Sequence, residues 1–228
     1  MNEDVHVCIV GPETVEVNAL RAQCDSFVLD TGKGLAAAIN AGIASLPESV
    51  RFVNWLGDDD LLAPGALTTL ATAMSVQHDA VLAYGYCTYI NGNDETLFTV
   101  RPSRLAESFL RFGPQLIAQP AMLFRRDSFQ EVGGLDDQLG WAFDLDLLLK
   151  LRRHGRFKPI PQVVASYRWH EGALTVGSRN QSVREASAVR VRHSPRFIRP
   201  FSQLWEPFVR RAVLQTGRSL SLRYLKSA

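Results

Sequence analysis

The chain has 228 residues, of which 46% are hydrophobic, a length and composition that support a buried core in one domain with an appendage or in two small domains. Its net charge of +2 is unevenly distributed, because residues 179–228 contain eleven Arg or Lys against two Glu (+9) whereas residues 1–178 carry −7. We expect an acidic body and a basic tail with separate roles, and the lack of any run of about 18 uncharged apolar residues argues against a membrane-spanning helix.

Two features bear on the compartment. The N-terminus is acidic, whereas a secretory signal peptide starts with basic residues, so we expect a cytoplasmic protein. The three cysteines, Cys8, Cys24 and Cys87, are odd in number and lack the close spacing of a metal site. They predict free thiols in a reducing compartment.

The first elements alternate between strand and helix patterns. Residues 5–10 predict a strand, residues 15–23 have helical character, and residues 26–30 predict a second short strand. Residues 35–46 predict a helix whose Ala-rich face packs closely on a sheet. Between these last two elements, Gly32-Lys33-Gly34 can cradle a phosphate with backbone N–H groups at the helix start, although an ordinary helix entry explains the same residues.

An apolar run that begins near Val53 stops at three consecutive carboxylates, Asp58, Asp59 and Asp60. This pattern predicts a buried strand that delivers acids to the edge where open α/β sheets bind ligands. Three adjacent like charges repel one another, so a divalent cation held between them is the simplest explanation. The alternative is that one of these acids caps a helix that starts near Pro64.

The middle of the chain continues the alternation. Residues 64–75 predict a helix, and residues 80–90 and 96–100 predict two strands joined by a hairpin turn at 91–94. This order of elements is typical of a doubly wound α/β sheet. Residues 119–124 then predict a further strand.

A second acidic group follows an aromatic, Gly-containing loop. The segment 140–151 predicts a helix that runs to about His154 and has a buried Leu stripe, and Asp144 and Asp146 lie at its start. Acids at that position are common partners of the helix dipole. A carboxylate shielded by Trp141 and Phe143 can also serve as a general base.

The region that follows predicts a strand pair or an edge strand over residues 157–169, broken by Pro159 and Pro161. It leads to His170, which is either a third metal ligand or an exposed loop side chain.

Five motifs, spread over about 120 residues, carry a family resemblance. They are Gly32-Lys33-Gly34 with Asn40-Ala41-Gly42-Ile43, Asp58-Asp59-Asp60 with Pro64-Gly65-Ala66-Leu67, Gln119 with Arg125-Arg126, Gly133-Gly134-Leu135-Asp136, and Asp144-Leu145-Asp146-Leu147. Together they resemble the inverting family 2 glycosyltransferases of GT-A fold, over residues 5–178. The resemblance implies an α/β, GT-A-like (Rossmann-like) mixed sheet flanked by helices in residues 1–178, followed by a basic helical C-terminal extension in residues 179–228.

The resemblance also implies a metal-dependent hexosyltransferase that acts on nucleotide-sugar donors in polysaccharide or glycolipid assembly, with a saccharide or lipid-linked acceptor. Asp60 and Asp58 match the family's metal-binding D-x-D element, with His170 as a further ligand of Mn²⁺ or Mg²⁺. Asp144 matches the catalytic base that deprotonates the acceptor hydroxyl as it attacks the anomeric carbon with inversion. The substrate-binding residues that we expect are Lys33, Gly34, Asp30, Asp58, Asp59, Gln119, Trp141 and Asp146.

The N-terminal region departs from this family. The chain starts at what resembles the family's second strand, and Glu13 or Asp30 would have to replace an acid that helps to hold the nucleotide. A sheet edge left open in this way would need covering, for example by a second copy in a homo-oligomer. The alternative function is therefore a nucleotide-sugar-binding or scaffold protein without efficient turnover.

The basic tail lies outside the resemblance. Residues 196–201 and a predicted helix over 205–224 mix aromatic side chains with arginines, as segments at membrane interfaces do. This composition predicts docking on an anionic membrane surface or on a partner enzyme, with a solvated basic helix as the alternative. Nucleic-acid binding is disfavoured because the acidic body would repel a phosphate backbone.

Overall fold

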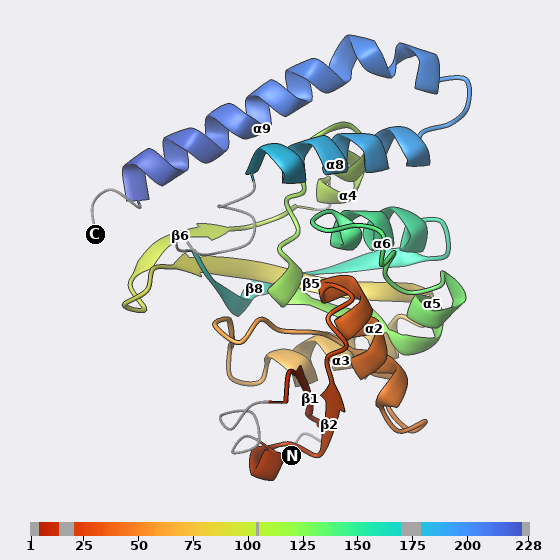
Figure 1. The fold of residues 1–228 in the computed structure, drawn as a ribbon, viewed down its shortest axis with the longest axis vertical. Coiled ribbons are helices and arrows are strands. Elements are labelled where there is room, and N and C mark those ends of the chain that lie inside the picture. Colours follow the sequence, from red (N-terminus) through yellow and green to blue (C-terminus); the bar gives the residue numbers. More distant parts are fainter. Residues whose placement is uncertain (1–4, 14–20, 104, 170–178, 225–228) are drawn as a thin grey trace.

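The computed structural model describes residues 5–13, 21–103, 105–169 and 179–224, which form two β-sheets surrounded by helices (Figure 1). The strands are β1 (Cys8–Gly11), β2 (Ser26–Leu29), β3 (Phe52–Val53), β4 (Leu61–Leu62), β5 (Ala80–Ile90), β6 (Thr96–Val100), β7 (Met122–Arg125) and β8 (Arg156–Arg168). The α-helices are α2 (Leu35–Ser45), α3 (Ala66–Val76), α4 (Ala106–Phe112), α5 (Arg126–Glu131), α6 (Phe143–Leu151), α8 (Arg179–His193) and α9 (Ser202–Tyr224). Short 3-10 helices are η1 (Arg21–Gln23), η2 (Gln119–Ala121) and η3 (Arg199–Phe201).

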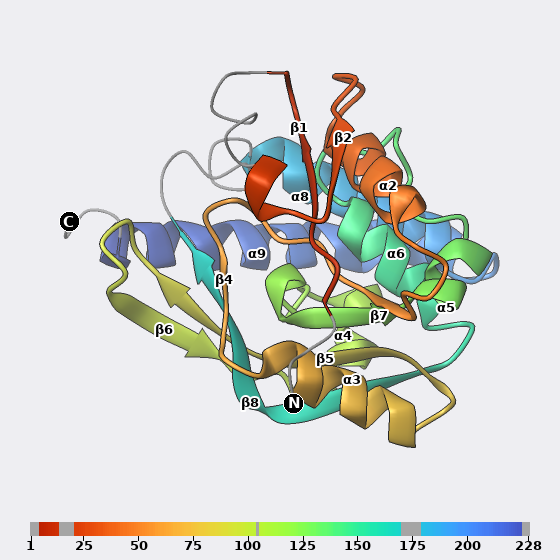
Figure 2. The ribbon, with the colours of Figure 1, turned by 90° about the horizontal axis from the view of Figure 1, so that it is seen from below.

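The N-terminal strands form a small sheet of their own. β1 and β2 are parallel, with Cys8 opposite Ser26, and α2 packs on them (Figures 1 and 2). The fit is close, because a Cβ atom added at Gly42 of α2 would lie 2.7 Å from the Val10 side chain. Both predicted strands and the helix that follows them are therefore confirmed, whereas the helix predicted over 15–23 is described only in the 3-10 turn η1.

The main sheet is six-stranded and mixed, with the order β3-β7-β5-β8-β4 and β6 beside β5. β5 runs parallel to β8 and antiparallel to β6 and β7. The mixed sheet agrees with expectation, but the doubly wound order does not. In the described residues, no strand pairs with strands of both sheets, so the small sheet is separate from the main one.

Two proline-containing segments differ from prediction. β8 is one continuous strand inside the sheet rather than a broken or edge strand, because the register shift between the Tyr84–Pro159 and Tyr86–Val163 pairs forms a bulge that accommodates the prolines. The strand predicted over 119–124 starts only at β7, because the residues around Pro120 form the 3-10 helix η2.

Helices cover both faces of the main sheet. α3 packs on one face, and α6 lies over the other with Leu147, Leu148 and Leu151 fully buried, as their spacing predicted. α8 packs on α6, and α9 lies outside α8 as the outermost layer (Figure 1). α9 includes the helix predicted over 205–224, and no helix among the described residues is long and apolar enough to cross a membrane.

Candidate active site

The three acids lie on a tight turn between β3 and β4. The backbone N–H of Asp60 donates to the Gly57 carbonyl at 3.2 Å, and this closes the turn. Asp58 is exposed and Asp59 is half-buried, whereas only 8% of Asp60 is exposed. The carboxylates of Asp59 and Asp60 both fold back against Gly57, where a Cβ atom would come within 3.0 Å and 3.2 Å of them. The turn therefore brings two carboxylates together.

Arg168, the last residue of β8, fixes this acidic turn. Its backbone N–H donates to Asp60 Oδ1 at 2.9 Å, and its guanidinium donates to the Asp59 carbonyl at 2.9 Å. The same guanidinium reaches the β5–β6 hairpin turn, where it donates to the Asn91 carbonyl at 2.9 Å and to Asp94 at 2.7 Å. The backbone N–H and the guanidinium of Arg168 thus hold the turn, and the sequence did not indicate this role of Arg168.

Asp144 lies in the first turn of α6, as predicted. Gln115 Nε2 donates to Asp144 Oδ2 at 2.8 Å, and the backbone N–H of Leu145 donates to Oδ1 at 2.7 Å. Burial raises the pKa of the Asp144 carboxyl, these hydrogen bonds oppose the rise, and the charge of Glu185 adds to it. The result is an oriented carboxylate that is more basic than an ordinary Asp, which suits a proton acceptor.

Tyr89 belongs to an aromatic cluster beside the acidic turn. Burial raises the pKa of its phenol, and the negative charges of neighbouring groups, Asp60 and Asp144 among them, raise it further. Its ring stacks on Phe98 at 4.6 Å between centroids and meets the Trp169 ring edge-on at 6.1 Å. Trp169 of this cluster directly follows Arg168, whose backbone N–H holds Asp60, so the aromatic cluster lies next to the acidic turn.

Glu185 of α8 caps the N-terminus of α6. Its carboxylate accepts hydrogen bonds from the backbone N–H groups of Gly140 (3.1 Å), Trp141 (2.7 Å) and Ala142 (2.6 Å). An anion at this end of a helix is stabilised by the free N–H groups and the helix dipole. The basic tail therefore contributes an acid that positions the helix carrying Asp144, which the sequence did not indicate.

Asp146 has a different environment from the substrate-binding position that we expected. Its side chain is fully buried and contacts Arg192 at 2.6 Å, His193 at 2.5 Å and Lys150 at 3.0 Å. Burial alone would raise the pKa of Asp146, but the hydrogen bonds from His193, Lys150 and Arg192 outweigh it and lower the pKa well below the usual range. With no exposed surface, Asp146 holds α6 on α8.

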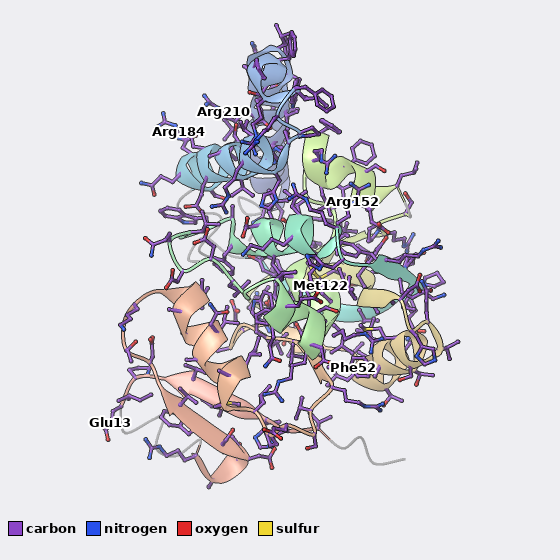
Figure 3. All side chains as sticks on the ribbon, turned by 90° about the vertical axis from the view of Figure 1, so that its right-hand side faces the viewer. Glu13, Phe52, Met122, Arg152, Arg184 and Arg210 are labelled. Carbon is purple, nitrogen blue, oxygen red and sulfur yellow. The ribbon has the colours of Figure 1, made fainter. Side chains whose placement is uncertain are left out.

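The expected nucleotide-binding residues gather at one edge of the small sheet. Asp30 follows β2, its backbone N–H donates to the Gly11 carbonyl at 2.9 Å, and its carboxylate accepts from the Gly32 N–H at 2.9 Å. Lys33 and Gly34 are exposed at the start of α2, and Gly34 has φ of 104°, which favours glycine. Glu13 is exposed (Figure 3) and follows the end of β1 by two residues, at the same end of the parallel pair as Asp30.

The other predicted site residues have mixed positions. Gln119 donates to Asn54 Oδ1 at 3.2 Å and to the Trp55 carbonyl at 2.5 Å, so its amide supports the segment that leads to the acidic turn. Trp141 is half-buried, and its indole N–H is buried without a protein partner. His170 lies outside the described residues.

Comparison with solved structures identifies the fold. Over 81% of this chain and 55% of the other, the chain matches S. aureus TarS 1-349 in complex with UDP, with a TM-score of 0.54 and 11% identity. Over 98% of this chain and 66% of the other, it matches the mannosyltransferase PcManGT from Pyrobaculum calidifontis, solved with GDP-Man and Mn²⁺, with a TM-score of 0.58 and 16% identity. The chain has a GT-A-like glycosyltransferase fold.

The likeness is one of structure. No protein-family model matches the sequence, and no protein of curated function matches it. The GT-A-like chain also spans little more than half of the TarS structure solved with UDP. Its activity is therefore argued from the arrangement of its own residues.

The acidic turn of this GT-A-like fold suits a divalent cation. Burial raises the pKa of Asp60 to about 6, the charges of Asp59 and Asp58 add to the rise, and the Arg168 backbone N–H opposes it. This concentrated negative charge and the oxygen donors fit Mn²⁺ or Mg²⁺. In the described part of the chain, no group of three or more His, Cys, Asp or Glu is arranged as a complete metal site. One or two carboxylates are enough for an ion that also binds substrate phosphates.

The recesses of the surface do not coincide with these acids. One recess of about 410 Å³ is lined by residues that include Gln77, Glu107 and Arg156. Arg156 begins β8, whereas Arg168, which holds the acidic turn, ends it. We assign the active site by the placement of the carboxylates, because this recess lacks a pair of acids.

Proposed function

We propose that the chain transfers a sugar from a nucleotide-sugar donor to an acceptor hydroxyl, with inversion at the anomeric carbon, in polysaccharide or glycolipid assembly. The observation that carries this proposal is the oriented carboxylate of Asp144, held by Gln115 and the Leu145 N–H, together with the buried Asp60 of the acidic turn, in a chain with a GT-A-like fold. The likeness to a mannosyltransferase solved with GDP-Man and to TarS solved with UDP supports a nucleotide-sugar donor.

Asp144 acts as the general base. The hydrogen bonds from Gln115 and the Leu145 N–H fix both carboxylate oxygens, so the group is oriented before the acceptor binds. It accepts the proton of the acceptor hydroxyl as that oxygen attacks the anomeric carbon from the face opposite the leaving diphosphate. Burial raises the pKa of this carboxyl, which increases its strength as a base.

Asp60, with Asp58, would hold Mn²⁺ or Mg²⁺. When bound, such an ion neutralises the donor diphosphate and stabilises the leaving nucleotide. The protein's contribution is the fixed position of the Asp60 carboxylate, which Arg168 holds from the end of β8. His170 follows that strand end by two residues, and we propose it as a further ligand.

The donor nucleotide binds beside the small sheet. Lys33 supplies an exposed positive charge, and the backbone at Gly34 opens the N-terminus of α2 toward solvent, where phosphate groups are favoured. Asp30 holds this loop through its bond to Gly32.

The second candidate function is donor binding without turnover. It is favoured by the separation of the two sheets, because the expected nucleotide residues lie on one sheet and the acidic turn on the other. Both functions predict binding of a nucleotide sugar, but only the transferase predicts release of the nucleoside diphosphate.

Thermal shift with a panel of UDP-, GDP- and dTDP-sugars, each with and without Mn²⁺, tests the shared step. We expect one nucleotide class to raise the Tm of the wild type more with Mn²⁺ than without it, because a ligand that binds only the folded state stabilises it. The extra rise in Tm that depends on Mn²⁺ should disappear in Asp60→Asn. It should remain in Asp127→Asn, a control that changes an exposed acid on α5. If no nucleotide sugar stabilises the protein, the proposed function is wrong.

A further inference from the structure

The outward face of the C-terminal region carries an exposed apolar stripe. Phe201, Leu204 and Phe208 are 58%, 67% and 73% exposed, and Phe197 in the preceding turn is 76% exposed. The spacing of the first three, i, i+3 and i+7, places them on one side of a helix. Isolated exposed apolar residues are common, but a row of large ones on one helix face marks an interaction surface.

The stripe faces outward because the opposite side of α9 is anchored. Glu206 is 6% exposed and forms a buried ion pair with Arg190 of α8, with Nε and Oε1 2.8 Å apart. Ser202, on the same side of the helix as Glu206, is also buried, and the Trp205 ring meets Phe112 of α4 at 6.0 Å between centroids. The orientation of α9 is thus fixed by its inner side, and the exposed phenylalanines are not part of that packing.

Positive charge surrounds the stripe. Arg196 and Arg211 are exposed, and Arg211 follows Leu204 by seven positions and Phe208 by three, so it lies beside the stripe. Arg210 is also exposed, but it lies one turn after Glu206, on the flank of the α8–α9 pair that carries Arg184 (Figure 3). Glu206 is the only acidic residue after Glu185, and its charge is used by the buried pair. The outer surface of α9 therefore combines large apolar side chains with arginines and has no exposed acid among its described side chains.

We propose that the outer face of α9, formed by Phe201, Leu204 and Phe208 with the flanking arginines, docks on an anionic lipid bilayer. A helix that presents Phe and Leu on one side and arginines beside them lies in the membrane interface, with its apolar face buried at the boundary of headgroups and acyl chains. Two copies of this chain would bring like charges together at the same face, whereas anionic headgroups complement them. The proposal does not depend on catalysis, and it would hold the protein at the surface where lipid-linked acceptors reside.

Vesicle flotation of the full-length chain tests this surface. The wild type should float with phosphatidylcholine vesicles that contain phosphatidylglycerol, and much less with phosphatidylcholine alone. Phe201→Ser with Phe208→Ser should lower the partition coefficient about tenfold or more, because two apolar side chains leave the membrane. Val76→Ser is the matched control, because Val76 is 79% exposed but lies on α3.

The charge contribution is tested separately. Arg196→Gln with Arg211→Gln should lower binding to the anionic vesicles about fivefold for each charge removed, whereas Arg51→Gln, an exposed arginine before β3, should not. Far-UV circular dichroism and Tm should be unchanged in all variants, because none of these side chains is buried. Equal flotation of the wild type and the double Phe variant would overturn the proposal. So would sedimentation showing that this variant dissociates an oligomer while vesicle binding stays unchanged.

Discussion

Two aspartates in the first turns of α6 have opposite environments. Asp144 is half-buried, and burial raises its pKa because it disfavours the ionised carboxylate. Asp146 is fully buried among Arg192, His193 and Lys150, which lower its pKa. The first arrangement favours proton transfer, and the second stabilises the fold.

The pair Asp144→Asn and Asp146→Asn separates these roles. Asp144→Asn should abolish sugar transfer while changing the free energy of unfolding by less than about 1 kcal/mol. Asp146→Asn should lower the free energy of unfolding by about 3 kcal/mol or more, because it leaves buried cationic partners without their anion. Urea unfolding followed by tryptophan fluorescence, together with donor turnover, measures both effects.

The contribution of Asp146 to the free energy of unfolding should depend on pH. Because the pKa of Asp146 is lower in the folded state than its ordinary value of 3.8, its contribution is complete above that value and is lost as pH falls below it. The gap in unfolding free energy between the wild type and Asp146→Asn should therefore narrow below about pH 4. A gap that stays constant down to pH 2 would contradict the assignment.

Glu185 is predicted to tune Asp144. Its negative charge raises the pKa of Asp144, so Glu185→Gln should lower that pKa and move the acid limb of the kcat/KM profile to lower pH. Glu131→Gln, an exposed acid on α5, is the control. A loss of stability with an unmoved acid limb would show that Glu185 only caps the helix.

Sequence could identify Asp144 but not the residues that orient it. The acid was recognisable because it begins an apolar helix after an aromatic loop. Gln115 and Glu185 lie 29 and 41 positions away along the chain and belong to no local motif, so only the fold brings them to α6. The buried environment of Asp146 was not predictable for the same reason, because Arg192 and His193 come from α8, and its role in substrate binding stays a prediction.

The helix α6 connects the two ends of the molecule. On one side, Asn40 of α2 bonds the backbone N–H and carbonyl of Leu135 at 3.0 Å and 2.8 Å, and Lys150 donates to the Gly134 carbonyl at 3.1 Å. On the other side, Asp146 of α6 joins Arg192 of α8. α8 thus packs on α6, while Leu204 and Phe208 on the outer side of α9 stay exposed.

The α8–α9 contact depends on the buried pair Arg190–Glu206. Arg190→Met and Glu206→Met should each lower the free energy of unfolding by about 3 kcal/mol, because each leaves one buried charge unpaired. The double variant should recover most of this loss, since a packed apolar pair replaces the ion pair. Urea unfolding of the four proteins measures the coupling, and losses that simply add would show that α9 is not docked in this way.

Some elements were predictable because a local signal was sufficient. The hairpin of β5 and β6 has the predicted limits, since a long strand pattern is interrupted by an Asn-Gly turn. β8 was not, because the bulge that accommodates Pro159 and Pro161 depends on the opposing strand β5. The separation of β1 and β2 from the main sheet also depends on pairing between distant segments.

Across the whole molecule, the function proposed from the motifs agrees with the fold. The unusual feature is the separate small sheet, which carries the residues expected to bind the nucleotide. The small sheet carries Asp30, Lys33 and Gly34, and the main sheet carries the acidic turn. Transfer requires one donor to reach both. Two hydrogen bonds between Asn40 of α2 and the Leu135 backbone join the small-sheet side to the segment before α6.

The central claim is tested most directly by nucleoside diphosphate release from the donor that thermal shift selects, measured with Mn²⁺ and a saccharide or lipid-linked acceptor. We predict turnover by the wild type, loss of turnover when Mn²⁺ is chelated, and a decrease of about a hundredfold or more in Asp144→Asn with donor binding retained. Donor binding by the wild type without nucleoside diphosphate release, or equal release by Asp144→Asn, would contradict it.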